Sequence, residues 1–375
     1  MKLEQLSLKD DAWSNAISEI DFSPDIFLLF VSPLFTQKDE LLNFLSQEFP
    51  GSTIVGCSTA GEISGINVSD NSVSLTAIKL EKVKHKLVKV EVNSMDDSLK
   101  SGVELGQQLV EEDLKHVLVF SDGLNVNGAD LVRGLRNILP KTSITGGLAA
   151  DGSDFNKTFV IANNAIEDKI IVGLGFYGEH LKIGYSSKGG WDSFGIDRLV
   201  TKSNKNVLYE LDGQPALELY KSFLGENAKN LPSSGLLFPL NMRVNEHDQP
   251  VVRTILSVDE ESQSLTFAGN IPEGAYVRLM KANVDRLIGG AEDSAKKAFR
   301  ATKENAELAI LISCVGRRLV LKQLVEEEVE VVQEIVGEQP KITGFYSYGE
   351  IAPFGEFSPC ELHNQTMTIT TLSEC

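Results

Sequence analysis

TIVGCSTAGE, residues 53–62, is the end of a pattern that the chain uses three times. In each copy an apolar, strand-like run is followed by a helix-patterned stretch, a proline, a short strand ending in glycine, and an alternating apolar strand. We name the copies 1, 2 and 3; they span residues 26–80, 117–177 and 310–372. Their glycines, which we expect to occupy one structural position, are Gly56, Gly146 and Gly344. Self-similarity of this kind indicates one supersecondary unit used three times.

The repeated unit predicts an α/β fold. The proline stops the helix, and the glycine permits a turn of positive φ before the last strand. A chain of 375 residues also exceeds what one hydrophobic core usually serves. We therefore expect repeated strand-helix-strand units that form mixed sheets in two intertwined lobes. Between copies 2 and 3 the pattern changes, Pro215 begins a helix, and we place a domain boundary near residues 215–220.

The turns after the glycines are the candidate ligand site. Ligands of α/β sheets usually bind in the loops at the C-terminal ends of the strands. We therefore expect the three turns to be structural features that also line one shared pocket. The residues predicted to line it are Gly56, Cys57, Ser58, Thr59, Gly146 and Gly344.

Catalysis by the first turn is the competing hypothesis, with Ser58 or Cys57 as the nucleophile of a hydrolase. A nucleophile elbow requires G-x-S-x-G, and here Gly61 comes one residue too late. Glu62 and Glu350 occupy matching places in copies 1 and 3, as paired catalytic carboxylates would, but carboxylates in such turns more often accept hydrogen bonds from backbone amides. We therefore expect a protein that is not an enzyme.

Composition excludes several classes of partner. With 53 acidic and 35 basic residues the net charge is −18, which disfavours nucleic acid and anionic membranes. Apolar runs such as residues 26–31 are far shorter than the roughly 20 residues of a membrane span, and the N-terminus lacks a secretory signal pattern. Four scattered cysteines without a C-x-x-C pair predict a reduced, cytoplasmic protein without a zinc ribbon.

One nucleotide-binding motif occurs by chance. Residues 173–178, Gly-Leu-Gly-Phe-Tyr-Gly, match G-x-G-x-x-G. Dinucleotide binding requires a helix after these glycines, but the residues that follow alternate as in a strand. We expect no dinucleotide site here.

The five histidines differ in their surroundings. His85, His116 and His247 lie in polar stretches and are predicted to be at the surface. His180 and His363 are flanked by strand-like apolar residues, as a metal or heme ligand would need to be. A buried histidine with satisfied hydrogen bonds is the more common explanation for each of these two.

Several segments together resemble the FIST sensory domain family, with its N-terminal and C-terminal parts. They include GCSTAGEI (56–63), TGGLAADG (145–152), GGWDSFG (189–195), FAGNIPEG (267–274) and GFYSYGEIAPFGE (344–356). The resemblance covers nearly the whole chain and implies FIST N over residues 24–216 and FIST C over 217–375. It also implies a cytoplasmic, non-enzymatic sensor of small ligands that acts with bacterial signalling partners.

Three runs are similar to the bacterial NosP subgroup, whose members are described as heme-containing nitric oxide sensors that regulate histidine kinases. The runs are YELDGQPALELY (209–220), SCVGRR (313–318) and HNQTMT (363–368). The similarity implies a heme held by one histidine, with His180 as the first candidate metal ligand and His363 as the second. Implied partners are a histidine kinase or a diguanylate cyclase or phosphodiesterase of cyclic-di-GMP signalling, and a homodimer is a further expectation.

The same similarity suggests which other residues would surround a heme. Tyr346 and Tyr348 are candidates to flank the porphyrin, and Arg317 or Arg318 to pair with its propionates. Core packing explains the aromatic residues equally well. The alternative is that the same pocket binds an amino acid or another small polar metabolite without heme.

Overall fold

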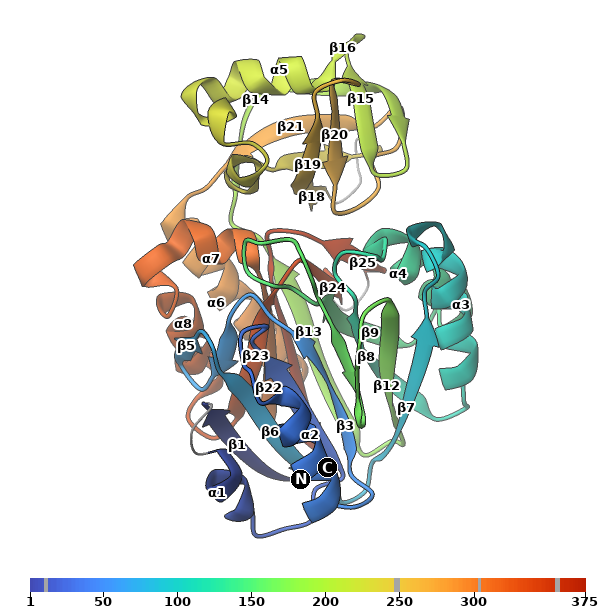
Figure 1. The fold of residues 1–375 in the computed structure, drawn as a ribbon, viewed down its shortest axis with the longest axis vertical. Coiled ribbons are helices and arrows are strands. Elements are labelled where there is room, and N and C mark those ends of the chain that lie inside the picture. Colours follow the sequence, from blue (N-terminus) through green and yellow to red (C-terminus); the bar gives the residue numbers. More distant parts are fainter. Residues whose placement is uncertain (10–12, 246–249, 303–304, 355–357) are drawn as a thin grey trace.

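The computed structural model describes residues 1–9, 13–245, 250–302, 305–354 and 358–375. They form a large body and a smaller upper lobe (Figure 1). Four mixed or antiparallel sheets carry most of the chain, with helices on their outer sides. The prediction of an α/β fold with mixed sheets and two lobes is confirmed.

Three sheets of six strands each make up the body, and their strand orders are equivalent. Sheet 1 contains, from edge to edge, β1 (Lys2–Leu8), β6 (Val73–Lys79), β2 (Ile26–Val31), β3 (Thr53–Ser58), β10 (Val160–Ala162) and β11 (Ala165–Glu167). Sheet 2 contains β7 (Lys84–Glu91), β12 (Ile170–Tyr177), β8 (Leu114–Ser121), β9 (Ser143–Leu148), β24 (Gly349–Pro353) and β25 (Cys360–His363). Sheet 3 contains β13 (Leu181–Lys188), β26 (Met367–Glu374), β22 (Leu308–Cys314), β23 (Lys341–Ser347), β4 (Glu62–Ser64) and β5 (Asn67–Ser69).

The three copies found in the sequence are the centres of these sheets. Each copy supplies a parallel pair, β2–β3, β8–β9 or β22–β23, and a third strand antiparallel to the first. The short hairpin that follows each pair joins a different sheet: β4–β5 of copy 1 joins sheet 3, β10–β11 of copy 2 joins sheet 1, and β24–β25 of copy 3 joins sheet 2. This cyclic exchange interlocks the three copies.

Alternating side chains of the first strands serve two cores. On β2, Ile26, Leu28 and Phe30 face a core shared by all three sheets, where the rings of Phe30, Phe120 and Phe345 have centroids 4.7–6.1 Å apart. Burial on both faces explains why these strands are continuously apolar in the sequence. The other face of each sheet is covered by helices. These are α1 (Trp13–Ser18) and α2 (Lys38–Glu48) at sheet 1, α3 (Ser98–Leu109) and α4 (Gly128–Ile138) at sheet 2, and α6 (Val284–Ala301) and α8 (Glu327–Val336) at sheet 3.

The three repeated glycines lie inside strands, so the prediction that they form the turns is wrong. Gly56, Gly146 and Gly344 lie within β3, β9 and β23, and of the three only Gly146 has a positive φ, +153°. A Cβ atom at any of them would lie 1.7–1.9 Å from a carbonyl oxygen of the neighbouring parallel strand. Glycine is therefore required by the close approach of two backbones, and the turns begin three or four residues later.

The upper lobe is inserted between β13 and α6 (Figure 1). Its sheet has the order β18 (Val251–Arg253), β17 (Leu240–Arg243), β21 (Tyr276–Lys281), β14 (Asp192–Asn204), β15 (Val207–Leu211), β20 (Ser264–Phe267) and β19 (Ile255–Asp259), with β16 (Gln214–Pro215) paired to β15. One helix, α5 (Ala216–Leu224), packs on this sheet, and the 3₁₀ turns η2 (Gly225–Asn230) and η3 (Ser233–Leu237) follow it. The upper lobe therefore contains residues from both of the domains expected from the sequence, 24–216 and 217–375, and each domain contributes to both lobes.

Polar contacts fix the upper lobe on the body. The buried Arg253 donates to the carbonyl oxygen of Leu362 at 3.0 Å, and Gln365 donates to that of Leu236 at 2.9 Å. The Asn270 amide donates to Asp130 at the start of α4 at 2.8 Å. The segment HNQT is therefore part of the contact between the lobes.

No helix in the described part of the chain is long and apolar enough to cross a membrane.

Candidate functional site

A cleft of about 880 Å³ opens where the turn of copy 1 faces the turn of copy 2. Its walls come from the ends of β2 and β3, from the end of β7, from the loop 151–159 and from the segment before β12. Among the described residues of copy 3, Arg318 alone lines the cleft; it lies in α7 (Val315–Leu321), which the 3₁₀ turn η4 (Lys322–Leu324) follows. Charged residues that line the cleft are Lys38, Glu62, Asp70, Glu91, Asp151, Asp154, Lys157, Glu167, Asp168, Lys169 and Arg318.

Copies 1 and 3 close their turns with a buried carboxylate. Glu62 accepts hydrogen bonds from the Thr59 hydroxyl and from the backbone and hydroxyl of Ser72, at 3.2 and 2.7 Å. Glu350 repeats the arrangement with the Ser347 hydroxyl at 2.7 Å and with the backbone and hydroxyl of Thr366 at 3.1 and 2.9 Å. Each carboxylate thus ties its turn to the residue before the next long strand.

Copy 2 lacks this closure. The register of the strands places Gly152 where copies 1 and 3 have the glutamate, and Ile170 where they have the hydroxyl residue. Both of these residues line the cleft. The turn of copy 2 is therefore not tied to β12 in this way, and it extends outward as the loop 151–159.

Other contacts hold that loop in place. The Asp151 carboxylate accepts hydrogen bonds from the backbone of Asn156 and Lys157 at 2.8 and 2.7 Å, and from the Tyr348 hydroxyl. The ring of Phe155 stacks on Tyr348 with centroids 4.6 Å apart and planes 7° apart. These contacts fix the loop of copy 2 against Tyr348 of copy 3.

The corresponding position between copies 2 and 3 is filled. There Gly123, Leu148 and Tyr348 face Phe267 and Ala268 of the upper lobe, and the space left is about 20 Å³. The upper lobe therefore covers this position, whereas the position between copies 1 and 2 is open.

The cleft presents charges of both signs. Arg318 makes two hydrogen bonds to the Asp70 carboxylate at 2.8 and 2.7 Å and also donates to the carbonyl oxygen of Ala60 at 2.5 Å. Lys157 and Lys169 are exposed, and among the described residues their ammonium groups have no partner. The exposed carboxylates of Glu91, Asp154 and Asp168 are likewise without partners in the described part of the chain. Such a cleft suits a ligand that carries both an acidic and a basic group.

Burial raises the pKa of Glu62 to about 7, although its hydrogen bonds from Thr59 and Ser72 act in the opposite direction. The Glu62 side chain is 2% exposed, at the floor of the cleft. Near neutral pH the Glu62 carboxyl is therefore protonated in part of the molecules and ionised in the rest.

Of the residues predicted to line the pocket, Thr59 lines the cleft. Cys57 and Ser58 lie in β3, fully buried, and Ser58 Oγ accepts a hydrogen bond from the backbone of Phe159 at 3.1 Å. Burial raises the pKa of the Cys57 thiol, so it is not a thiolate. Gly56, Gly146 and Gly344 bring the strands together behind the turns.

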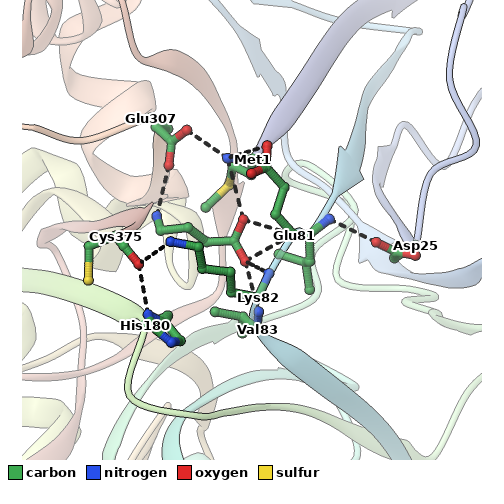
Figure 2. A network of polar contacts seen from close by, with 10 residues as sticks. Met1, Asp25, Glu81, Lys82, Val83, His180, Glu307 and Cys375 are labelled. Atoms are coloured by element: carbon green, nitrogen blue, oxygen red, sulfur yellow. Dashed lines mark hydrogen bonds and ion pairs between the residues drawn. The ribbon is translucent and has the colours of Figure 1, made fainter.

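His180 lies away from the cleft. It precedes β13, at the end of sheet 3 opposite to Arg318, and its exposed ring places Nδ1 2.8 Å from the carbonyl oxygen of Cys375. Figure 2 shows this ring beside Cys375, next to a polar network that includes Met1, Lys82 and Glu307. In that network the Glu374 carboxylate accepts hydrogen bonds from the backbone of residues 81–83, and the Met1 amine pairs with Glu307. None of the residues that line the cleft belongs to this network.

The other residues predicted to surround a heme have structural partners. Arg317 is fully buried and donates to the Glu328 carboxylate at 3.0 and 2.7 Å and to the carbonyl oxygen of Gly189 at 2.8 Å. The buried Tyr346 hydroxyl donates to the other Glu328 oxygen at 2.6 Å. Tyr348 supports the loop of copy 2 through Asp151. Arg318 is the arginine of this run that lines the cleft.

The remaining histidines are also engaged within the fold. The surface position predicted for His116 is wrong: it is buried, its nitrogens lie 2.8 Å from Ser143 Oγ and 3.0 Å from Thr145 Oγ1, and burial lowers its pKa to about 3. His363 is buried, with Nε2 2.8 Å from the Ala352 oxygen, and burial lowers its pKa to about 4. His85 is half-buried, 3.0 Å from Thr53 Oγ1, and His247 lies outside the described residues.

None of the four described histidines lines the cleft, so within the described residues the cleft offers no histidine ligand to a heme. The described residues also contain no group of three or more metal-ligating side chains placed to hold an ion.

Sequence reasoning missed most of the lining residues. Lys157 lies in the loop 151–159 and Lys169 between β11 and β12, outside any periodic pattern, and Asp70 follows a hairpin that joins another copy's sheet. The sequence offers Arg318 only as an alternative to Arg317. One signal for the site is present in the sequence: copy 2 has Gly152 where copies 1 and 3 have Glu62 and Glu350, and this marks the turn that differs from the others.

Family comparisons match two domains along the chain. The FIST N domain matches residues 25–214, and the FIST C domain matches residues 216–353. FIST domains are generally sensor domains in signalling proteins.

Two proteins similar in sequence are described only as uncharacterized. An uncharacterized protein of Methanocaldococcus jannaschii is 26% identical over 362 residues, covering 86% of this chain and 69% of its own. An uncharacterized protein of Mycobacterium tuberculosis is 22% identical over 232 residues, covering 60% of this chain and 59% of its own. Among solved structures, a chorismatase and a cyanuric acid hydrolase are 10% and 7% identical and align over nearly their full lengths, each with a TM-score of 0.38. These scores are too low to support an argument about fold or activity.

Proposed function

The chain belongs to the FIST family, and from this premise we propose that it is a non-enzymatic sensor of a small zwitterionic metabolite, such as an amino acid. The ligand would bind in the cleft between copies 1 and 2. The observation that supports this most is the presence of unpaired lysines and unpaired carboxylates in one open cleft, on the described residues. A ligand with both charges satisfies both sets, whereas a singly charged ligand leaves one set unpaired.

Binding without catalysis agrees with the chemistry of the lining. Among the described lining residues there is no cysteine or histidine, and the Thr59 hydroxyl is bonded to Glu62. Ser58 and Cys57, the candidates for a hydrolase nucleophile, are buried behind the turn. The described lining therefore offers neither a thiol nor an imidazole, and the Thr59–Glu62 pair ties the turn of copy 1 to Ser72.

The signal would reach a signalling partner, for which a histidine kinase or a cyclic-di-GMP enzyme is the proposed class. Ligand contacts to Arg318 would compete with its bonds to Asp70 and Ala60, which join α7 of copy 3 to copy 1. The protein would then have two arrangements, with and without these Arg318 bonds, and a ligand shifts the balance between them only if it binds the two with different affinities.

A thermal-shift screen tests the ligand. Each amino acid would be compared with its decarboxylated amine and its deaminated acid, because a ligand that binds only the folded state raises the melting temperature. We expect at least one zwitterion to raise it and its two analogues to have little effect. Lys157→Ala and Lys169→Ala should reduce the shift, whereas Lys297→Ala, an exposed residue of α6, should not. If no zwitterion shifts the melting temperature, the proposal is wrong.

Heme-based nitric oxide sensing, implied by the NosP similarity, is tested separately. Protein supplied with heme should show no Soret band that responds to nitric oxide. A responsive band that His180→Ala or His363→Ala removes would replace the zwitterion proposal with heme sensing.

A further inference from the structure

The cleft between copies 1 and 2 has an apolar wall in addition to its charged groups. The wall is formed at sheet 1, by side chains that follow β2, precede β10 or lie in β11. Its members are Pro33, Leu34, Phe159 and Ile166. The unpaired lysines and carboxylates of the cleft match the two charged groups of a zwitterion, but they leave this wall without a role.

Leu34 places a large apolar side chain in water at this wall. It is 67% exposed, the largest exposed fraction among the large apolar side chains in the described part of the chain. Its backbone N–H donates to Ser32 Oγ at 3.3 Å, and the next residue, Phe35, is fully buried in the core beside sheet 1. The loop is thus held with Phe35 inside the core and Leu34 outside it. Single exposed apolar residues are common on proteins, but one that lines a concave site indicates a contact for a ligand.

The rest of the wall is the edge of a core. Phe159 belongs to the core between sheet 1 and its two helices, and Ile166 packs against that core. The ammonium group of Lys38 lies 6.0 Å from the centre of the Phe159 ring. Because this core ends at the cleft, an apolar group bound there would extend it and would remove Leu34 from water.

Both unpaired lysines lie close to the wall. Lys157 is two residues before Phe159, and Lys169 is three residues after Ile166. An extended chain spans at most about 3.6 Å per residue, so the Cα atoms of these pairs are at most about 7 and about 11 Å apart. A ligand whose carboxylate contacts either lysine therefore lies next to the wall.

The size of the cleft agrees with a ligand that fills more than its charged contacts. Its volume of about 880 Å³ lies within the roughly 300–1,000 Å³ of sites for drug-sized molecules. The ammonium and carboxylate of a zwitterion occupy only a small part of this space. The remainder is available to a side chain.

We propose that the ligand of this cleft is a zwitterion with a large apolar side chain, which would pack on Leu34, Phe159 and Ile166. This inference rests on the proposed function and narrows its ligand to amino acids such as leucine, methionine or phenylalanine. Removal of that side chain and of Leu34 from water favours these ligands over polar ones of similar shape.

Three matched pairs of amino acids test the inference by isothermal titration calorimetry on the full chain. They are leucine and asparagine, methionine and glutamine, and phenylalanine and histidine, in which each apolar side chain has a polar counterpart of similar shape. In at least one pair the apolar member should bind at least about tenfold more tightly than its counterpart. If a polar amino acid binds most tightly, or if every pair differs less than this, the inference is overturned while the zwitterion function stands. Absence of binding by every amino acid, polar or apolar, overturns the proposed function and this inference with it.

Variants locate the apolar side chain of the ligand. Leu34→Asn should reduce the ratio of affinities within the preferred pair at least about threefold, by weakening the apolar member and leaving its polar counterpart unchanged. Ile196→Asn changes a residue of the upper lobe that is 66% exposed and does not line the cleft, and it should leave the ratio as in the wild type. An unchanged ratio in Leu34→Asn would place the apolar side chain elsewhere and overturn the assignment.

Discussion

The Glu350→Gln variant should be less stable than the wild type at acid pH and more stable than the wild type at alkaline pH. Glu350 is fully buried, and burial raises its pKa to about 8 from the usual 4.5, although hydrogen bonds from Ser347 and Thr366 oppose this shift. Below pH 4.5 both the folded and the unfolded protein hold the proton. Between pH 4.5 and 8 only the folded protein holds it, so the free energy of unfolding falls as pH rises and the full loss is reached above pH 8.

The magnitude follows from the two pKa values. One pKa unit corresponds to about 1.4 kcal/mol, so ionisation of Glu350 costs the folded protein about 5 kcal/mol at high pH. Glutamine has the same shape and stays neutral, and its amide can donate to Ser347 while its oxygen accepts from Thr366. We allow about 1 kcal/mol for the altered hydrogen bonds. The variant should therefore be about 1 kcal/mol less stable than the wild type below pH 5 and about 4 kcal/mol more stable above pH 8.

Urea unfolding of both proteins at intervals from pH 4.5 to 9 measures this difference. At each pH the free energy of unfolding of the wild type is subtracted from that of the variant. This subtraction cancels the contributions of all other titratable groups that the substitution leaves unchanged. Glu334→Gln, on the exposed face of α8, serves as the control and should give a difference independent of pH. A Glu350→Gln difference that is also flat across this range would refute the reasoning.

Three further predictions concern the core. Gly344→Ala should destabilise the protein by about 1–3 kcal/mol or more, because the added Cβ would lie 1.9 Å from a carbonyl oxygen. Gly289→Ala in α6, where a Cβ would have nothing within 4 Å, should instead stabilise the protein by up to about 1 kcal/mol. Thermal melting distinguishes the two variants, and equal changes in melting temperature would contradict the close approach at Gly344. Arg317→Met should lower the free energy of unfolding by about 3–5 kcal/mol, because it leaves the buried Glu328 carboxylate without its charged partner. Chemical denaturation measures this change, and a loss below about 1 kcal/mol would contradict the prediction. A thiol reagent should modify one cysteine, Cys375, in the native protein and all four after denaturation; a second reactive native thiol would contradict the buried positions.

The repeated unit could be predicted from the sequence because local patterns define it. Apolar runs, helix periodicity and the proline gave the strand, helix and strand of each copy. The reason for Gly56 could not be predicted, because the constraint is a carbonyl oxygen of the neighbouring strand, 27 residues away along the chain. The exchange of hairpins also has no local signal, since each hairpin pairs with a strand of another copy.

The site was harder to predict because it depends on departures from the repeat. Quoted alone, the turn with Cys57 and Ser58 has the composition of a catalytic site, yet both residues are buried by the pairing of β3 with β10. The position of His116 just before an apolar strand predicts a solvated residue, but Ser143 and Thr145 on the neighbouring strand form hydrogen bonds with its ring. In both cases partners distant in sequence decide whether a polar residue is exposed.

A strict threefold repeat would offer three equivalent clefts, and this chain has differentiated them. A buried glutamate closes the turn in copies 1 and 3, whereas Gly152 and Ile170 leave copy 2 without that closure. The upper lobe fills the position between copies 2 and 3 with Phe267 and Ala268. The open cleft between copies 1 and 2 then holds the unpaired charges of the loop 151–159 together with Arg318 from copy 3. Since all three copies contribute to this cleft or to its support, a ligand bound there would contact residues of copies 1 and 2 together with the Arg318 side chain of copy 3.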